Sequence, residues 1–311
     1  MSETSLPLIS VALCTFNGEK HVTEQLESIL SQSYKSIEII ICDDQSTDGT
    51  FEILKRYATN YPTISLYQND RNLGFVKNFE QAISRCTGEY IALSDQDDIW
   101  MKEKLTILIT QIGNFELIYH DSNLIDHKGK LIPQIKMSDH YRSYDGTSNL
   151  PFLISNCVAG HAMLFKSTLV SVILPFKSEF YHDWWIAFVA ITVGKIKAIP
   201  DVLVNYRQHD LTITDTLNLK TQDLSTENKG FLNYNLNWVN YCSGFSLNNR
   251  NQKEVIKIYD YLVAYREGLR GFRLFLFLLK YYHILFYFHL KGKSRLSQLN
   301  TIRKICFTTH K

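Results

Sequence analysis

The sequence predicts an α/β protein in which a mostly parallel sheet carries helices on both faces and a helical region follows at the C-terminus. Apolar strand-like runs alternate with helix-like segments over the first hundred residues, as in parallel βαβ units. The expected strands are apolar almost throughout, which is typical of strands covered on both faces. The 311 residues are 45% hydrophobic and 21% charged, so the chain is globular and can bury a large core.

The first half of the chain yields its elements in a regular order. Residues 19–31 have helical periodicity because Val22, Leu26 and Ile29 recur on one side. In chain order we expect strands at 8–16, 37–42, 64–68 and 90–94 and helices at 19–31, 47–61 and 74–85. Ligands of such sheets bind beyond the carboxyl ends of the strands, so the strand tips are where functional residues are expected.

The pattern loosens after Trp100. We expect strands at 116–121, 161–166 and 195–199, an aromatic-rich helix at 182–193, a loop at 211–229 and helical structure at 248–290.

Three carboxylates in four residues follow the fourth expected strand, in the segment Asp95-Gln96-Asp97-Asp98. Crowded carboxylates repel one another unless a cation lies between them. Carboxylate oxygens suit Mg²⁺ or Mn²⁺, which often remain bridged to substrate phosphates. A solvated acidic loop that caps the next helix is the alternative, and the position at a strand end favours the metal.

Three further residues are candidates with an ordinary structural alternative each. Asp44, at the end of the second strand, can accept hydrogen bonds from a base or a ribose, or cap the next helix. Asp183 lies among aromatic residues, where burial would raise its pKa and make it a general base; an exposed helix start is the alternative. His209 can complete a metal shell or be a surface residue. Trp184 and Trp185 are either an aromatic wall on which a ligand could stack or core residues.

Charged residues are distributed unevenly along the chain. From Arg266 to Lys311 there are ten Lys or Arg and one acidic residue, whereas the rest carries 23 basic and 30 acidic residues. The segment 268–305 combines this basic charge with a strongly apolar run at 272–290. We expect it to contact an anionic membrane as an amphipathic helix; packing on the domain or in a dimer is the alternative. Nucleic-acid binding is not expected because the body is acidic.

The cysteines and the N-terminus bear on location. None of the six cysteines forms a CxxC pair and several lie in apolar runs, which indicates buried thiols in a reducing compartment. The first seven residues lack an apolar core, so no secretory signal is expected. The expected location is the cytoplasm, at the inner face of the plasma membrane.

Taken together and in order, these motifs resemble the inverting GT-A-fold glycosyltransferases of family 2. The similar segments extend from about residue 8 to residue 212 and include VALCTFNGE (11–19), IIICDDQSTDGT (39–50), SDQDDIW (94–100), CVAGHAMLF (157–165), HDWW (182–185) and YRQH (206–209). The resemblance implies a Rossmann-like GT-A domain at 1–215, with a nucleotide-sugar half at 1–100 and an acceptor half at 101–215. The basic, aromatic-rich region 216–311 follows it.

The resemblance also implies roles for individual residues. Asp183 is the expected base, and Asp97 with His209 is expected to hold Mn²⁺ or Mg²⁺. The residues expected to contact the nucleotide-sugar donor are Thr15, Asn17, Asp44, Lys77, Asp95 and Gln96. The acceptor is expected to be a saccharide or a lipid-linked glycan.

Within the family, SDQDDIW with HDWW and YRQH is most similar to bacterial rhamnosyltransferases of O-antigen, capsule or wall polysaccharide synthesis, which use dTDP-L-rhamnose. One departure from the family pattern is His161 in the acceptor-side segment, where related sequences often carry a small or thiol residue. This difference bears on the identity of the acceptor and not on the chemistry.

Two other functions are weighed against sugar transfer. A non-catalytic, membrane-docked binder of nucleotide sugars would be expected to have lost the tetrad or the base, and both are present. A nucleotidyltransferase would usually carry a Gly-rich basic loop after the first strand, whereas residues 15–19 (TFNGE) are poor in both.

Overall fold

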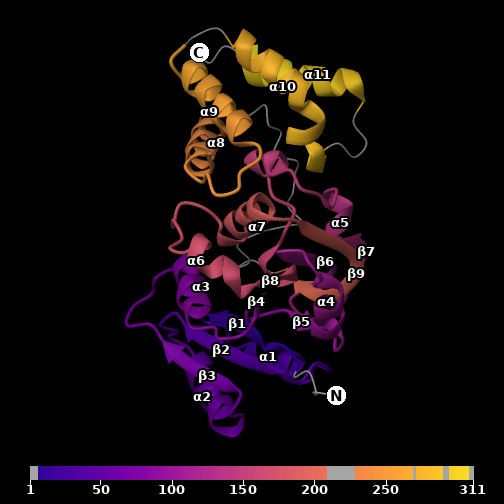
Figure 1. Ribbon diagram of the computed structural model, residues 1–311. Helices are drawn as coiled ribbons and strands as arrows, with labels where there is room; N and C mark the ends of the chain where they lie inside the picture. The colour runs from indigo at the N-terminus through magenta and orange to yellow at the C-terminus, as the bar shows by residue number, and fades with distance from the viewer. Residues whose placement is uncertain (1–5, 209–227, 269–270, 290–293, 308–311) are drawn as a thin grey trace, which may run out of the picture.

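A computed structural model describes residues 6–208, 228–268, 271–289 and 294–307. Its centre is one mixed, mostly parallel sheet in the order β3-β2-β1-β4-β8-β6-β9-β5, with β7 paired to β6 (Figure 1). The strands are β1 (Ile9–Thr15), β2 (Ile37–Asp43), β3 (Ile64–Gln68), β4 (Tyr90–Ser94), β5 (Ile99–Trp100), β6 (Leu117–Ile125), β7 (Leu131–Lys136), β8 (Met163–Lys166) and β9 (Ile196–Arg207).

The first four strands form the expected parallel half of the sheet. β1 pairs in parallel with β2 and with β4, and β2 pairs in parallel with β3. Their carboxyl ends therefore meet at one edge, which is where the predicted site residues were expected. β8 then pairs antiparallel with both β4 and β6, so the sheet is mixed beyond β4.

Helices cover both faces because alternate strand residues enter two separate cores. Val11 and Leu13 of β1 join one core, and Ala12 and Cys14 join the other. The first core is covered by α1 (Val22–Leu30), α2 (Thr50–Asn60) and α4 (Lys104–Ile112). The second is covered by α3 (Phe75–Ser84) and α7 (His182–Val193). The expected α/β fold class is confirmed.

α7 is apolar on all sides because it lies between two layers. Trp185 of α7 stacks on Tyr241 of α8 with ring centroids 4.1 Å apart, so the C-terminal helices continue the core beyond α7 (Figure 1). These helices are α8 (Asn228–Ser243), α9 (Gln252–Arg266), α10 (Phe272–Leu285) and α11 (Arg295–Phe307). The remaining short helices are α5 (Met137–His140), α6 (Val170–Ile173), η1 (Leu150–Leu153), η2 (Gly160–Ala162), η3 (Ser167–Leu169) and η4 (Tyr287–His289).

Several expected bounds are wrong in the second half of the chain. The strand expected at 161–166 begins at Met163, and His161 lies in the short helix η2. The strand expected at 195–199 continues to Arg207, past Pro200, because the pairing between β6 and β9 contains register shifts that accommodate extra residues. The helical run expected at 248–290 is broken after Arg266, where Gly268 has a φ of +82°.

The predicted domain division at residue 215 and most of the loop expected at 211–229 fall among residues outside the described part of the chain. Among the described residues, no helix has both the length and the apolar character needed to cross a membrane.

Candidate active site

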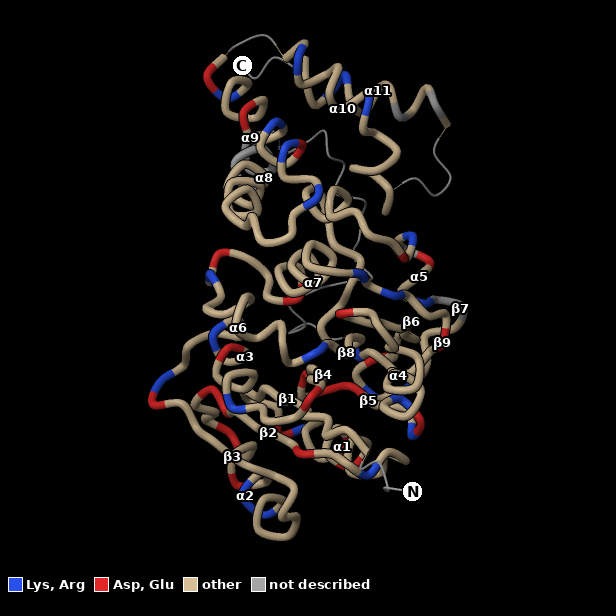
Figure 2. The backbone as a smooth tube through the Cα atoms, in the orientation of Figure 1, with Lys and Arg blue, Asp and Glu red and all other residues tan. Residues whose placement is uncertain are grey.

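Three carboxylates gather at the tip of β4, where the chain turns into β5 (Figure 2). Asp98 is fully buried, and Asp95 and Asp97 are half-buried. Oδ1 of Asp98 accepts a hydrogen bond of 3.0 Å from the backbone N–H of Arg207, but Oδ2 has no hydrogen-bond partner among the described residues. A buried carboxylate oxygen without a donor is unfavourable unless a proton or a cation satisfies it.

The electrostatics of this cluster indicate a deficit of positive charge. Burial, together with repulsion from Asp97 and Asp183, raises the pKa of Asp95 to about 7, while Lys104 opposes the shift. Burial, with repulsion from Asp97 and Asp95, also raises the pKa of Asp98 well above its usual range. A divalent cation at this position would stabilise the ionised forms of both carboxylates.

His161 brings a nitrogen to the same cluster. One ligand atom each from Asp95, Asp98 and His161 lie within 4.8 Å of one another. Burial, and then the nearby Lys104, lower the pKa of His161 to about 3, so its imidazole is neutral at physiological pH. Nε2 of His161 lies 2.9 Å from Oγ of Ser122, and the ring stacks on Tyr206 at 4.3 Å. Two carboxylates and an oriented neutral imidazole form a donor set that suits Mn²⁺ or Mg²⁺.

Lys104 places a buried amine beside the cluster. It is fully buried at the start of α4, and its Nζ donates a hydrogen bond of 2.7 Å to the carbonyl of His161. The ammonium also lies 3.3 Å from the centroid of the Trp100 ring, within cation–π range. Burial lowers the pKa of Lys104 well below its usual range, whereas Asp98 and Asp95 raise it. Neither Lys104 nor His161 was among the site residues predicted from the sequence.

The end of β9 fixes the backbone of the tetrad. Arg207 is buried, and its Nε donates to the carbonyl of Asp97 at 2.7 Å while its guanidinium pairs with Glu24 of α1. Together with the bond from its N–H to Asp98, these contacts join β9, α1 and the loop after β4. The positions of Asp97 and Asp98 are therefore set by three elements that are distant in sequence.

Asp183 lies at the N-terminus of α7 and interacts electrostatically with Asp95 of the acidic cluster. Burial raises its pKa to about 6, while hydrogen bonds from the backbone N–H groups of Trp184 and Gly160 oppose the shift. The Trp184 N–H lies 2.6 Å from its Oδ1. Because Asp183 contributes to the raised pKa of Asp95, the two carboxylates are near enough to interact. The carboxylate is ionised at pH 7 and has a pKa close enough to neutrality to accept a proton.

The two tryptophans after Asp183 anchor α7. Nε1 of Trp184 donates to the carbonyl of Phe152 at 2.7 Å, and Nε1 of Trp185 donates to the carbonyl of Ile173 at 3.0 Å. Trp185 is buried in the core. Of the two alternatives, packing therefore accounts for Trp185, and Trp184 is tied to the same framework.

Predicted donor-contacting residues lie at the tips of β1 and β4. Gln96 donates to the carbonyl of Phe16 at 3.0 Å and accepts from its N–H at 2.8 Å. Oδ1 of Asn17, whose φ is +50°, accepts from the N–H of Thr47 at 2.8 Å. Thr15 Oγ1 donates to Asp43 at 2.9 Å. The structure brings these side chains to one edge of the sheet, and their contacts with a donor stay predictions.

Asp44 is fully engaged by the loop that precedes α3. Its Oδ1 accepts from the N–H of Leu73 and from Nδ2 of Asn69, and its Oδ2 accepts from the N–H of Gly74, each at 2.8 Å. It is 2% exposed. The side chain clamps residues 69–74, and its predicted contact with a nucleoside stays a prediction.

Lys77 and His209 are not joined to the cluster by any described contact. Nζ of Lys77 donates to Glu80 at 2.8 Å and to the carbonyl of Phe176 at 2.7 Å, so the described partners of the ammonium belong to α3 and to the segment before α7. His209 lies outside the described residues. Their predicted roles, toward phosphates and metal respectively, stay predictions.

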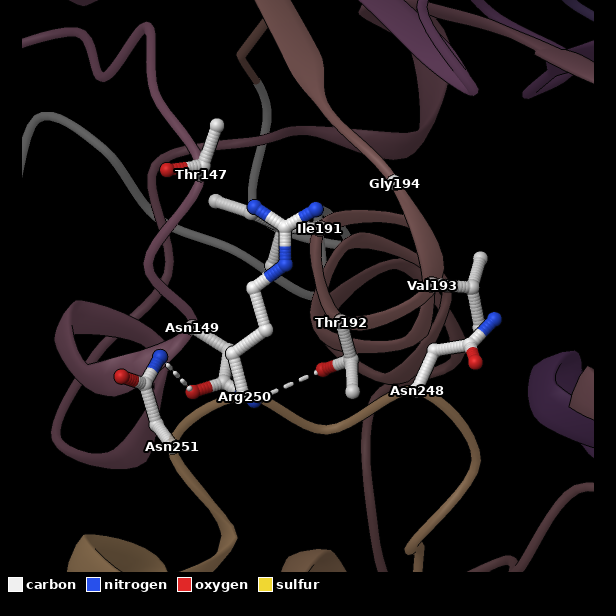
Figure 3. A pocket seen from close by; sticks show the side chains of 9 residues that line it. All are labelled: Thr147, Asn149, Ile191, Thr192, Val193, Gly194, Asn248, Arg250 and Asn251. Atoms are coloured by element: carbon white, nitrogen blue, oxygen red, sulfur yellow. Dashed lines mark hydrogen bonds between the residues drawn. The ribbon is translucent and has the colours of Figure 1, made fainter.

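A polar pocket of about 420 Å³ lies at the other end of α7 (Figure 3). Arg250 extends into it beside Thr192 and Asn149, and Asn149 is held by hydrogen bonds to Thr192 and Asn251. None of its lining residues belongs to the strand tips. The pocket is therefore separate from the predicted site residues at the strand tips.

A mixed α/β sheet with carboxylates at its strand tips has the general architecture of a nucleotide-binding enzyme. The chain belongs to glycosyl transferase family 2, whose model matches residues 10–172. It is 45% identical over 100 residues to the putative glycosyltransferase EpsE of Bacillus subtilis, covering 32% of this chain and 36% of EpsE. It is 37% identical over 99 residues to the putative teichuronic acid biosynthesis glycosyltransferase TuaG of the same organism, covering 32% of this chain and 39% of TuaG. The match thus spans little more than a third of each relative.

Two solved structures share the fold. S. aureus TarS 1-349 in complex with UDP-GlcNAc superposes with a TM-score of 0.57 at 17% identity, covering 96% of this chain and 81% of that one. The mannosyltransferase PcManGT of Pyrobaculum calidifontis, in complex with GDP-Man and Mn²⁺, has a TM-score of 0.52 at 16% identity and covers 90% of this chain and 76% of that one. At these identities the likeness shows the GT-A-like fold alone.

Proposed function

We propose that this protein is an inverting, metal-dependent glycosyltransferase that moves a sugar from a nucleotide-diphosphate donor to an acceptor hydroxyl in bacterial surface polysaccharide synthesis. One observation carries the proposal: Asp183, whose pKa is raised to about 6, lies close enough to a separate carboxylate cluster to raise the pKa of Asp95 within it. A proton acceptor beside a cation site is what single-displacement sugar transfer requires.

A divalent ion at the tetrad would act as a Lewis acid on the diphosphate leaving group. The residues fit such an ion, because Asp98 has a buried oxygen without a donor and His161 offers a neutral imidazole. Asp97 remains the predicted principal ligand, with Asp95 directed to the sugar or the ribose and His209 as a further ligand. The PcManGT complex contains Mn²⁺, which supports a divalent cation of this kind as the metal of the present protein.

Asp183 is the proposed base. Its carboxylate accepts the proton of the acceptor hydroxyl as that oxygen forms a bond to C1 of the donor sugar. The bond from C1 to the diphosphate oxygen breaks on the opposite side, so the anomeric centre inverts. The backbone N–H groups of Trp184 and Gly160 hold the carboxylate in place during this transfer.

The donor best supported by the sequence motifs is dTDP-L-rhamnose. This rests on the similarity of SDQDDIW, HDWW and YRQH to rhamnosyltransferases, whereas TarS, which shares the fold, was solved with UDP-GlcNAc. The proposed acceptor is a saccharide or lipid-linked glycan, as in O-antigen, capsule or wall polymers; the name of TuaG supports a wall polymer. The proposed location is the cytoplasmic face of the plasma membrane.

A donor screen tests this function. The thermal midpoint is measured with Mn²⁺ and, in turn, dTDP-L-rhamnose, UDP-GlcNAc and GDP-mannose, with the metal-free protein as the control. We expect one donor to raise the midpoint only when Mn²⁺ is present. That donor is then incubated with a saccharide acceptor, and the anomeric configuration of the product is read by NMR. If no donor is bound with metal, or if the product retains the donor configuration, the proposed function fails.

A further inference from the structure

α10 is buried on one side and exposed on the other. Leu274, Leu278 and Leu285 are buried on the inner side. Just after α10, Phe288 packs against Phe152 of η1 with ring centroids 5.3 Å apart. The helix is therefore fixed to the body of the protein through its inner side, and its outer side is left without a described partner element.

The outer side of α10 is apolar with a basic edge. Phe272, Leu276 and Leu279 are 57%, 48% and 42% exposed, and helical geometry places them within about 60° of one another. Arg273 and Lys280, which are also exposed, follow along one edge of this stripe about 20° apart. Large apolar side chains on an exposed face usually mark a contact surface.

α11 repeats the same arrangement beside it. Leu296 and Leu299 are 79% and 42% exposed, and the exposed Arg303 lies between them and Phe307 on the same side of the helix. The ring of Phe307 is 5.3 Å from that of Phe275 in α10, so the apolar side chains of the two helices meet at this contact. We call the exposed sides of α10 and α11 the apolar-basic face.

The charge around this face has one sign. From Gly268 to Lys311 the sequence carries nine Lys or Arg and no Asp or Glu. Figure 2 shows blue segments without red on α10 and α11, while acidic segments gather around the sheet. A second copy docked symmetrically on this face would bring the basic residues of both copies into one interface, which is unfavourable. An anionic partner with an apolar interior complements both properties.

We propose that the apolar-basic face docks on an anionic phospholipid bilayer, with Phe272, Leu276 and Leu279 entering the boundary between headgroups and acyl chains and the basic residues contacting phosphates. The docking surface consists of the exposed sides of α10 and α11. Its purpose, to bring the protein to a lipid-linked acceptor, rests on the proposed function.

Vesicle flotation tests the docking with the full chain and no donor or metal, so its outcome does not depend on sugar transfer. Vesicles contain phosphatidylcholine alone or with about 30% phosphatidylglycerol. We expect at least roughly fivefold more protein to float with the anionic vesicles, and about 0.5 M salt to remove most of the difference.

Three variants identify the surface. Phe272→Ser with Leu276→Ser and Leu279→Ser should reduce flotation to the level of neutral vesicles, and Arg273→Gln with Lys280→Gln should reduce the preference for anionic lipid several-fold. The matched control is Leu6→Ser with Leu131→Ser and Leu247→Ser, which removes three similarly exposed apolar residues elsewhere and should leave flotation unchanged. Circular dichroism and the thermal midpoint establish that each variant is folded.

Three outcomes overturn the proposal. The first is flotation that does not depend on anionic lipid. The second is flotation that neither the apolar variant nor the charge variant reduces. The third is that the protein does not float and forms a dimer in light scattering, which the apolar variant converts to a monomer. The last result would assign the face to a second copy of the chain. Because the charge variant alters only exposed side chains, the test remains decisive if the apolar variant does not fold.

Discussion

Buried carboxylates lie at the strand tips on either side of β1, and their hydrogen bonding differs. At the tip of β2, Asp43 accepts hydrogen bonds from Thr15, Ser46 and Gln68, and Asp44 accepts three from residues 69–74. At the tip of β4, Asp98 has one backbone donor and an oxygen with no described partner.

The difference teaches that burial alone does not identify a reactive carboxylate. Asp43, Asp44 and Asp98 are all buried, yet the two carboxylates of β2 are held by donors from neighbouring loops and fix those loops. At the tip of β4, by contrast, Oδ2 of Asp98 has no donor among the described residues, and the pKa of Asp95 is raised to about 7. We expect substitutions at the β4 tip and at the proposed base to affect catalysis, and substitutions at the β2 tip to affect stability.

The largest expected effect is that of Asp183→Asn. The amide cannot accept the proton, so turnover should fall by roughly 10³-fold while donor affinity stays within about twofold. Turnover is measured by release of the nucleoside diphosphate, and donor affinity by calorimetry. Asp201→Asn, a half-buried carboxylate of β9, is the control. Near-normal turnover of Asp183→Asn would show that another group takes the proton.

Asp97→Ala should lower turnover by roughly 10²-fold and abolish the response to Mn²⁺, because a ligand of the cation is lost. The free energy of unfolding without metal should be unchanged or higher, since a charge that repels Asp95 and Asp98 is removed. Mn²⁺ titration and urea unfolding measure the two effects, with the exposed Glu103→Ala as the control. Retained Mn²⁺ affinity would transfer the metal role to Asp98 and His161.

Asp44→Asn should lower the free energy of unfolding by about 2 kcal/mol, because an amide cannot accept from both Leu73 and Gly74 in the same geometry. Urea unfolding measures this, with the exposed Asp70→Asn of the same loop as the control. Should the variant be fully stable but lose nucleotide affinity, Asp44 would be a donor-binding residue instead of a clamp.

Lys104→Met should weaken Mn²⁺ binding at pH 7 by about tenfold. Lys104 lowers the pKa of Asp95 and of Asp98, so removing its charge leaves more of both carboxylates protonated. Calorimetry across pH detects the shift, and Lys102→Met, an exposed neighbour, is the control. Lower stability with unchanged metal affinity would make Lys104 a structural residue only.

The smallest effect expected is a pH dependence of the unmodified protein. The pKa of Asp183 is raised to about 6, and only its ionised form accepts a proton. With Mn²⁺ saturating, kcat/KM should therefore be level above pH 7 and fall about tenfold between pH 7 and pH 5. The profile is measured with a fixed donor, and a flat profile over this range would contradict the assignment.

The parallel half of the sheet could be predicted because its signals are local. Each of β1 to β4 is a short apolar run, and each tip carries polar residues directly after it. The acidic tetrad and Asp183 could be selected in the same way. The sequence could not predict which carboxylate oxygens lack donors, because the hydrogen bond from Arg207 to Asp98 joins residues more than a hundred positions apart.

Residues whose role depends on distant partners were missed for the same reason. Lys104 lies at the start of a helix, where a lysine is normally exposed, and only the fold buries it beneath Asp98 and against Trp100. The spacing of Lys104 four residues after Trp100 is the one local signal. The length of β9 was underestimated because Pro200 and Asp201 interrupt the apolar pattern at a point where the pairing shifts register.

Gln96 gives the site a property that no single ligand residue supplies. Its side-chain amide binds both backbone groups of Phe16, and it packs so closely on Gly18 that a Cβ at that position would meet its Oε1 at 2.3 Å. The loop after β4 and the loop after β1 are therefore held together as one unit. If these loops hold the cation and the nucleotide as proposed, the factor by which the cation raises nucleotide affinity must equal the factor by which the nucleotide raises cation affinity. The cation and the nucleotide are then expected to bind and dissociate together.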